Sequence, residues 1–195
     1  MKKRLSICMF YIRCQVYRLA LLLAGLLALD AAVCLLWFRG GAAFGQGAGG
    51  TALLVVTLAG YLGCVALCAA PFSRRSRYGY TLQRLQIPEH SVFLWHCAVN
   101  AVCFLIFLGA QAAAVAGLAG LWQHSADYSS GPQGVLLAFY RSELLHALLP
   151  LHELSLWVRN VLYALCAGIF CAYAQLRLRY GKVPTPILIP LSSLA

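Results

Sequence analysis

The chain has very few acidic residues and few charges of either sign. Five aspartates and glutamates stand against 15 lysines and arginines in 195 residues, so the formal net charge is +10. Charged residues make up 10% of the chain, whereas soluble globular domains carry about 25%. Hydrophobic residues make up 62%, more than a globule of this size can bury. These proportions exclude an ordinary soluble domain and predict a membrane protein.

The motifs of nucleotide binding and of nucleophilic catalysis are also missing. No GxxxxGK[ST] sequence occurs, and the glycine-rich link at 40–50 has no lysine that could contact a phosphate. Neither Ser142 beside Glu143 nor Cys97 beside His96 has the third group that an activated nucleophile needs. We therefore predict that the chain is not an enzyme and does not bind ATP itself.

Nine cysteines occur without any CxxC pair, and most lie inside apolar runs. This placement predicts small packing residues rather than a disulfide framework. Glu143 and His146 stand three residues apart, and Cys64 and Cys68 four apart, but neither pair belongs to a ligand set of recognised spacing. We predict no metal and no cofactor, with a metal carrier or a membrane enzyme as the remaining minor alternative.

Four apolar segments are long enough to cross a bilayer, which takes about 20 residues. They are residues 19–38, 51–72, 91–122 and 157–176. Segment 91–122 is unusually long, but it contains no polar turn and predicts one long or tilted helix. The first segment lacks the small-residue cleavage site of a signal peptide and predicts a retained anchor. The predicted fold is an all-α, polytopic helical bundle that forms one integral membrane domain, 1–195.

The basic residues are distributed unevenly between the two sides of these spans. Twelve lie in the N-terminal 18 residues, in the loop 73–90 and after Leu176, whereas three lie in the other connections. The positive-inside rule then places both termini and loop 73–90 in the cytoplasm of a multi-pass protein of the bacterial plasma membrane. Because no basic stripe is interleaved with exposed aromatic residues, we predict no nucleic-acid partner.

Two segments outside the spans carry patterns of their own. Residues 1–18 place apolar side chains on one helical face with arginines off it, which predicts an amphipathic helix in the inner interface. The alternative is that they form only the start of the first span. Residues 135–156 are apolar but too charged to span, and predict an outer interfacial or re-entrant helix with a break at Pro150. Residues 177–195 then form a cytoplasmic tail.

Asp30 lies near the middle of the first span, where a carboxyl group needs a partner or a proton. The rise of about 1.5 Å per residue places Tyr61 at the same depth, with Asn100 and Gln111 on either side of that level. One hypothesis makes these residues polar elements of a translocation path. The other makes Asp30 a residue that fixes helix packing.

Small residues recur every four positions on two of the predicted spans. Such faces let helices approach closely in lipid, and predict tight packing within the bundle or between subunits. The two faces consist of Gly109, Ala113 and Gly117, and of Ala164, Gly168 and Ala172.

The loop sequence GYTLQRLQIPEH, followed by an apolar span, resembles the cytoplasmic coupling loop of type-2 ABC exporter permeases. Trp95–His96 and the segment 139–150 are similar to small permease-like membrane proteins of gut Firmicutes. The loop residues that match the family pattern are Gly79, Thr81, Leu82, Leu85 and Pro88.

The resemblance implies a separate ATPase that docks on loop 73–90, and a permease path built by two chains. Arg77 and Arg84 would then face an acidic groove of the ATPase, although the arginines of the loop also serve as topological anchors. The chain departs from the family in having four spans where six are usual. The sequence thus predicts a permease-like subunit of an ABC exporter, and the alternative is a non-transporting accessory or sensor protein of the membrane.

Overall fold

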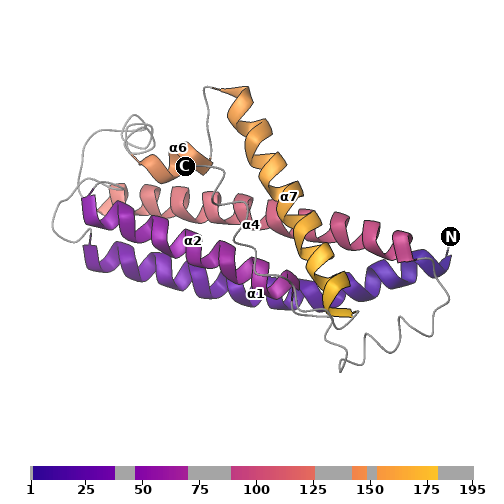
Figure 1. Ribbon diagram of the computed structural model, residues 1–195. Coiled ribbons are helices and arrows are strands. Elements are labelled where there is room, and N and C mark those ends of the chain that lie inside the picture. Colours follow the sequence, from indigo (N-terminus) through magenta and orange to yellow (C-terminus); the bar gives the residue numbers. More distant parts are fainter. Residues whose placement is uncertain (1, 38–46, 70–88, 126–141, 149–152, 180–195) are drawn as a thin grey trace.

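The computed structural model describes residues 2–37, 47–69, 89–125, 142–148 and 153–179, and these ranges are entirely helical apart from two end residues (Figure 1). This confirms the predicted all-α class. The helices are α1 (Lys2–Trp37), α2 (Gly47–Ala69), α4 (Glu89–Ser125), α6 (Glu143–Leu148) and α7 (Leu154–Arg179).

Four of these helices are long and apolar enough to cross a membrane, which confirms a multi-pass membrane protein. The candidate spans are Gln15–Leu36, Gly49–Ala69, His90–Leu121 and Leu154–Arg177. The third is a single helix, as its lack of a polar turn predicts. Its 37 residues give α4 a length of about 55 Å, against about 30 Å for the hydrocarbon core of a bilayer. We therefore expect α4 to tilt or to extend into the interfaces.

The N-terminal segment is not a separate element. Residues 1–18 and 19–38 are predicted as an interfacial helix and a span, whereas α1 runs without a break from Lys2 to Trp37. The reason is that neither glycine nor proline occurs between residues 2 and 24, so nothing interrupts the hydrogen bonds of the helix where its polarity changes. In Figure 1 this basic end of α1 projects beyond the end of α2.

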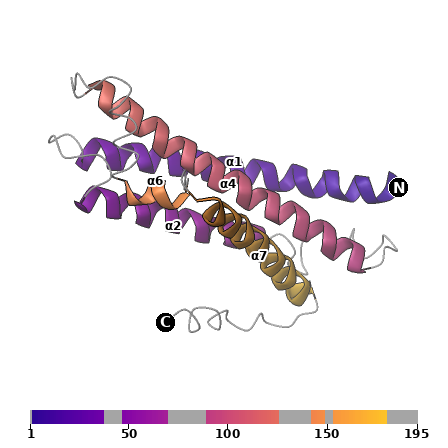
Figure 2. The ribbon, with the colours of Figure 1, turned by 90° about the horizontal axis from the view of Figure 1, so that it is seen from above.

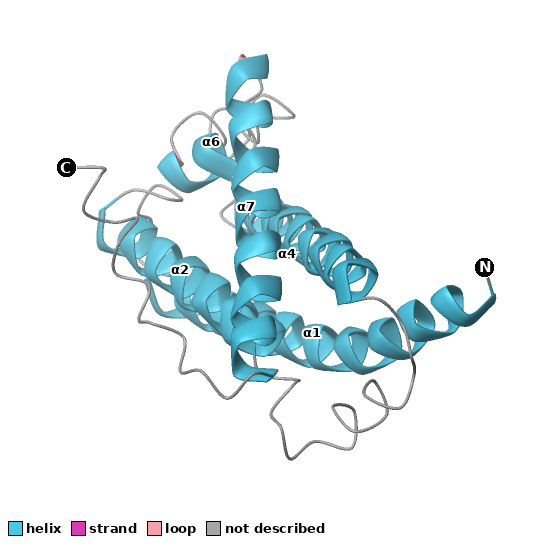
Figure 3. Cartoon of the chain, turned by 45° about the vertical axis from the view of Figure 1, so that its right-hand side comes forward, coloured by secondary structure: helices cyan, strands magenta, loops and turns pink. Residues whose placement is uncertain are grey.

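The helices α1 and α2 form an antiparallel pair, and two glycines of α2 allow them to approach closely. Leu26 fills the notch at Gly60, and Leu22 fills the notch at Gly63, one turn further along. The helix α4 lies along this pair, and α7 crosses it at a steep angle, so that the N-terminal end of α7 stands away from the other helices (Figures 1 and 2). The same crossing is visible from the side in Figure 3.

Two apolar clusters hold the bundle together. The larger one joins α1, α2, α4 and α7 around Phe104 and Phe107, whose side chains are fully buried. The smaller one lies between α1, α2, α4 and α6, and includes Val33, Leu53 and Leu144. Gln111, whose contacts are described below, lies between the two clusters along α4.

The helix α6 is short, and α7 holds its C-terminal end. The side-chain amide of Asn160 donates hydrogen bonds to the carbonyl oxygens of Ala147 (3.1 Å) and Leu148 (3.4 Å). These carbonyls have no partner within their own helix, so Asn160 acts as a cap supplied by a neighbouring helix. The predicted outer segment 135–156 thus contains a helix of six residues, and α7 begins three residues before the predicted start at 157. Pro150 lies outside the described residues.

Replacing Asn160 by leucine should loosen α6 specifically. Loss of the two bonds to carbonyl groups is expected to cost about 1 kcal/mol, or roughly a fivefold rise in local opening. Hydrogen exchange of the 143–148 amides measures this directly. Ser155→Ala is the matched control, because it removes only a long, exposed bond to Glu153. Equal exchange in the two variants would contradict the capping role of Asn160.

Candidate functional site

A polar junction joins three helices inside the membrane-spanning part of the bundle. The amide nitrogen of Gln111 in α4 donates to Oδ2 of Asp30 in α1, at 2.6 Å, and to Oγ1 of Thr57 in α2, at 3.2 Å. The Thr57 hydroxyl in turn donates to the carbonyl oxygen of Leu53, at 2.9 Å. Asp30 is 0% exposed and Gln111 2% exposed. A buried carboxyl group is therefore bonded to a neutral amide and not to a cation.

The packing of α1 against α2 explains why Thr57 lies near Asp30. From the contact of Leu26 with Gly60, Asp30 is one turn further along α1, and Thr57 is one turn back along the antiparallel α2. The two residues therefore stand at the same level. Gln111 reaches both from α4 because its two amide protons can serve two acceptors at once.

The Asp30 carboxyl group is only half satisfied. Its second oxygen, Oδ1, is buried without a hydrogen-bond partner among the described residues. A carboxyl group in a transmembrane helix costs several kcal/mol on insertion, about 2.5–3.5 on translocon scales. An unpaired buried acceptor adds to this cost. The buried carboxyl group therefore lowers the stability of the bundle, and helix packing alone does not require it.

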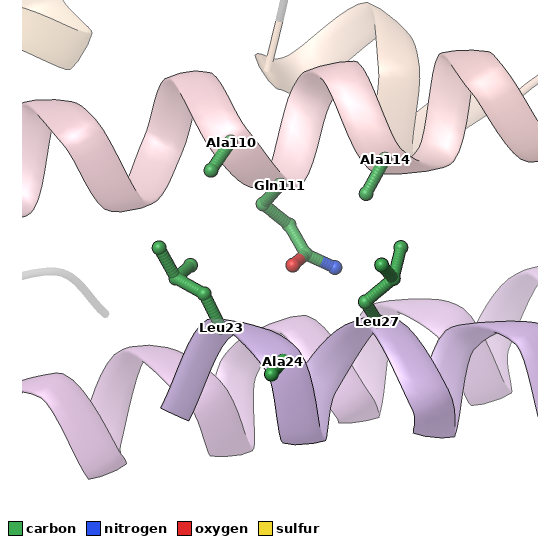
Figure 4. Close-up of a pocket in the computed structure, with 6 residues that line it drawn as sticks. All are labelled: Leu23, Ala24, Leu27, Ala110, Gln111 and Ala114. Atoms are coloured by element: carbon green, nitrogen blue, oxygen red, sulfur yellow. The ribbon is translucent and has the colours of Figure 1, made fainter. Parts of the chain in front are cut away.

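A pocket of about 320 Å³ opens beside the junction, between α1 and α4. In Figure 4 the Gln111 side chain points from α4 into this space, with leucines of α1 on both sides of it. Gln111 is the only lining residue with a polar side chain. The six lining residues are Leu23, Ala24, Leu27, Ala110, Gln111 and Ala114.

The other two predicted intramembrane polar residues are Tyr61 and Asn100. Tyr61 packs its ring against Phe104 (centroids 5.4 Å apart) and Phe107 (6.3 Å). Asn100 is buried on α4, eleven residues before Gln111 and so about 16 Å away along the helix. Depth alone predicts Tyr61 as the neighbour of Asp30, whereas the structure gives Gln111 as its hydrogen-bond partner. Thr57 is not predicted from the sequence. Its position one helical turn before Tyr61 could have indicated that it lies near the depth of Asp30.

A second polar group lies near the other end of α2. The Gln15 amide donates to the Cys68 sulfur at 3.2 Å, and the Gln175 amide donates to the carbonyl oxygen of Cys68. The Cys171 thiol donates to the carbonyl oxygen of Val65, at 3.8 Å. Gln15 and Gln175 are not predicted from the sequence, and they tie α1 and the C-terminal part of α7 to α2. Four cysteines of the chain are buried in the same core: Cys64, Cys68, Cys103 and Cys171.

These thiols do not form a metal site in the structure. Across the described ranges, no group of three or more His, Cys, Asp and Glu side chains is arranged to hold a metal ion. Seven cysteines have described side chains and are free: Cys34, Cys64, Cys68, Cys97, Cys103, Cys166 and Cys171. Cys64, Cys68, Cys103 and Cys171 pack in the buried apolar core, as small apolar residues do.

The two predicted small-residue faces behave differently. Ala164, Gly168 and Ala172 are buried, and a Cβ added at Gly168 would stand 2.7 Å from the backbone nitrogen of Ala101 in α4. The second face is exposed, and nothing lies within 4 Å of a Cβ added at Gly109 or Gly117. The face of Gly109, Ala113 and Gly117 therefore makes no close helix contact among the described residues, and its packing between subunits stays a prediction. The large and polar residues of α4, such as Phe104 and Gln111, turn toward α1, α2 and α7 instead.

The predicted coupling residues lie outside the described residues. These are Arg77, Thr81, Leu82, Arg84, Leu85 and Pro88. Their role therefore stays a prediction from the sequence. No family model, no curated protein and no solved structure matches the chain.

Proposed function

We propose that the chain is a permease-like transmembrane subunit of an ABC exporter of the bacterial plasma membrane, which couples through loop 73–90 to a separate ATPase. The observation that carries the proposal is the half-satisfied carboxyl group of Asp30 beside a pocket in the bundle. Intramembrane ionisable residues of this kind mark substrate or ion pathways. Packing alone needs no such group, because α4 and α7 pack through small residues at Gly168 and Ala101.

Loop 73–90 supplies the coupling part of the proposal. It is the one connection between predicted spans that lies on the basic, cytoplasmic side, and it resembles the permease coupling loop at Thr81 to Pro88. An ATPase can dock on a short helix of this kind by packing against its leucines. Arg84 and the arginines at 74–77 would complement an acidic groove and speed association.

Four spans call for additional chains around the path. The outward faces of α1 and α7 are rich in exposed apolar side chains, and the small-residue face of α4 around Ala113 is open to a neighbour. Close approach of helices at small residues drives association in lipid. A second permease chain, identical or different, would complete the path.

Replacing residues 81–88 by a Gly/Ser linker of equal length should abolish copurification of an ATPase. The tagged chain is purified from native membranes in mild detergent, copurified proteins are identified by mass spectrometry, and phosphate release from ATP is measured in the eluate. We expect the amount of a copurified P-loop protein and the phosphate release to fall at least tenfold, because the proposed docking segment is lost. The matched control is the same linker at 186–193 in the tail, which should leave both unchanged. Equal ATPase recovery from all three proteins would overturn the coupling role of the loop.

The second candidate function is a non-transporting accessory or sensor subunit. The exposed face of Gly109, Ala113 and Gly117 favours it, since an accessory protein needs only such a helix-binding surface. The same purification separates the two functions. A stable complex with another membrane protein, with no P-loop protein and no phosphate release, would support the accessory role.

A further inference from the structure

The pocket between α1 and α4 has an apolar wall and a single polar side chain. Leu23, Leu27 and three alanines form the wall, and Gln111 enters from α4 (Figure 4). Ala24 and Leu27 are exposed at the outer surface of the bundle, so the pocket opens sideways between the two helices. In a bilayer such an opening admits molecules from the lipid phase without passage through water.

The Gln111 side chain leaves one acceptor at this pocket. The Gln111 nitrogen uses its two protons on Asp30 and Thr57, so the amide oxygen is the group that remains for a ligand. Asp30 itself is fully buried and does not line the pocket, so Gln111 supplies the polar contact for a ligand. A buried acceptor gains most from a molecule that brings a donor.

From this complementarity we propose that the pocket binds an amphiphile with an alkyl chain and a hydrogen-bond-donating head group, such as a primary amine or an alcohol. The head group donates to the Gln111 amide oxygen near Asp30, and the chain lies between Leu23 and Leu27. The pocket has a volume of about 320 Å³. This is the lower end of the usual size range for ligand pockets. The proposal concerns binding alone and needs no ATPase.

Radiolabelled n-decylamine is the probe for this site. The purified full-length protein is placed in lipid nanodiscs, and binding is measured against empty nanodiscs at equal lipid concentration. We expect one saturable site per chain. Unlabelled n-decanol should displace the probe, because its hydroxyl group also donates a hydrogen bond. Decanoate has an alkyl chain of similar length, but its carboxylate head group at neutral pH only accepts hydrogen bonds. Displacing decylamine with decanoate should therefore require at least a tenfold higher concentration than with decanol.

A matched pair of variants locates the site. Ala114→Phe fills the pocket and should weaken decylamine binding at least tenfold, whereas Ala98→Phe, at an exposed position of the same helix outside the pocket, should leave binding unchanged. A second pair on the other helix guards against misfolding of the first. Ala24→Phe should act like Ala114→Phe, and Ala28→Phe, which is exposed outside the pocket, should not.

Several outcomes would overturn the proposal. These are the absence of a saturable component, binding that survives both pocket-filling variants, and equal competition by decanoate and decanol. A dimeric wild type that binds no decylamine, and becomes monomeric with Ala114→Phe, would show that the pocket receives a second chain instead. Loss of ATPase copurification in the loop variant does not bear on any of these measurements, so the two proposals fail independently.

Discussion

Replacing Gly168 by alanine is expected to destabilise the bundle, although the same change in an open helix position is stabilising. A Cβ at residue 168 would stand 2.7 Å from the Ala101 nitrogen and 2.9 Å from its Cα. Because both are backbone atoms of α4, no rotamer change can relieve the contact, and the helices must separate. We expect a loss of about 1–3 kcal/mol for alanine and more for leucine.

Gly109→Ala is the matched control for this substitution. Nothing lies within 4 Å of a Cβ at Gly109, so only the helix propensity changes, and a gain of about 0.5–1 kcal/mol is expected. The free energy of unfolding in mixed dodecyl maltoside and SDS micelles measures both variants. The two shifts should therefore have opposite signs. Shifts of the same sign and size would mean that α7 does not contact α4 at Ala101.

These two glycines also show how far the sequence can predict this fold. The length of the spans follows from the thickness of the bilayer, and for this reason the four membrane helices are predictable. The rotation of each helix about its axis is not, because a span that is apolar on all sides has no hydrophobic face to orient it. Gly109 and Gly168 both belong to faces with a small residue at every fourth position. They differ only in that Gly168 packs against Ala101, which is 67 positions away in the sequence, whereas nothing lies close to Gly109.

The partners of Asp30 show the same limit within the site. The sequence identifies Asp30 and Gln111 as polar residues of the spans, and helix geometry places Tyr61 at the depth of Asp30. Depth does not determine direction, however, and the Tyr61 ring turns toward Phe104 and Phe107. Thr57, a weakly polar residue in an apolar helix, bonds to Gln111 instead. Weakly polar residues within apolar spans, such as Thr57, are therefore difficult to identify from the sequence.

Removing Gln111 should destabilise the protein more than removing both Gln111 and Asp30. In Gln111→Leu the Asp30 carboxyl group loses its one hydrogen bond to a described residue while it stays buried. Leaving such a buried group without its partner costs about 1–3 kcal/mol, and more when the group is charged. In the double variant Asp30→Leu/Gln111→Leu no carboxyl group remains in the spans, so much of that loss should be recovered.

A double-mutant cycle with the same unfolding assay measures the coupling between the two residues. We expect the double variant to be more stable than Gln111→Leu by at least about 1 kcal/mol, a coupling typical of contacting residues. Asp30→Asn is the conservative control, because an asparagine oxygen can still accept the Gln111 proton. Additive losses would contradict a direct bond between the two side chains. A double variant as stable as the wild type would show that packing does not require the carboxyl group, and would leave ligand binding or transport as the reason for its presence.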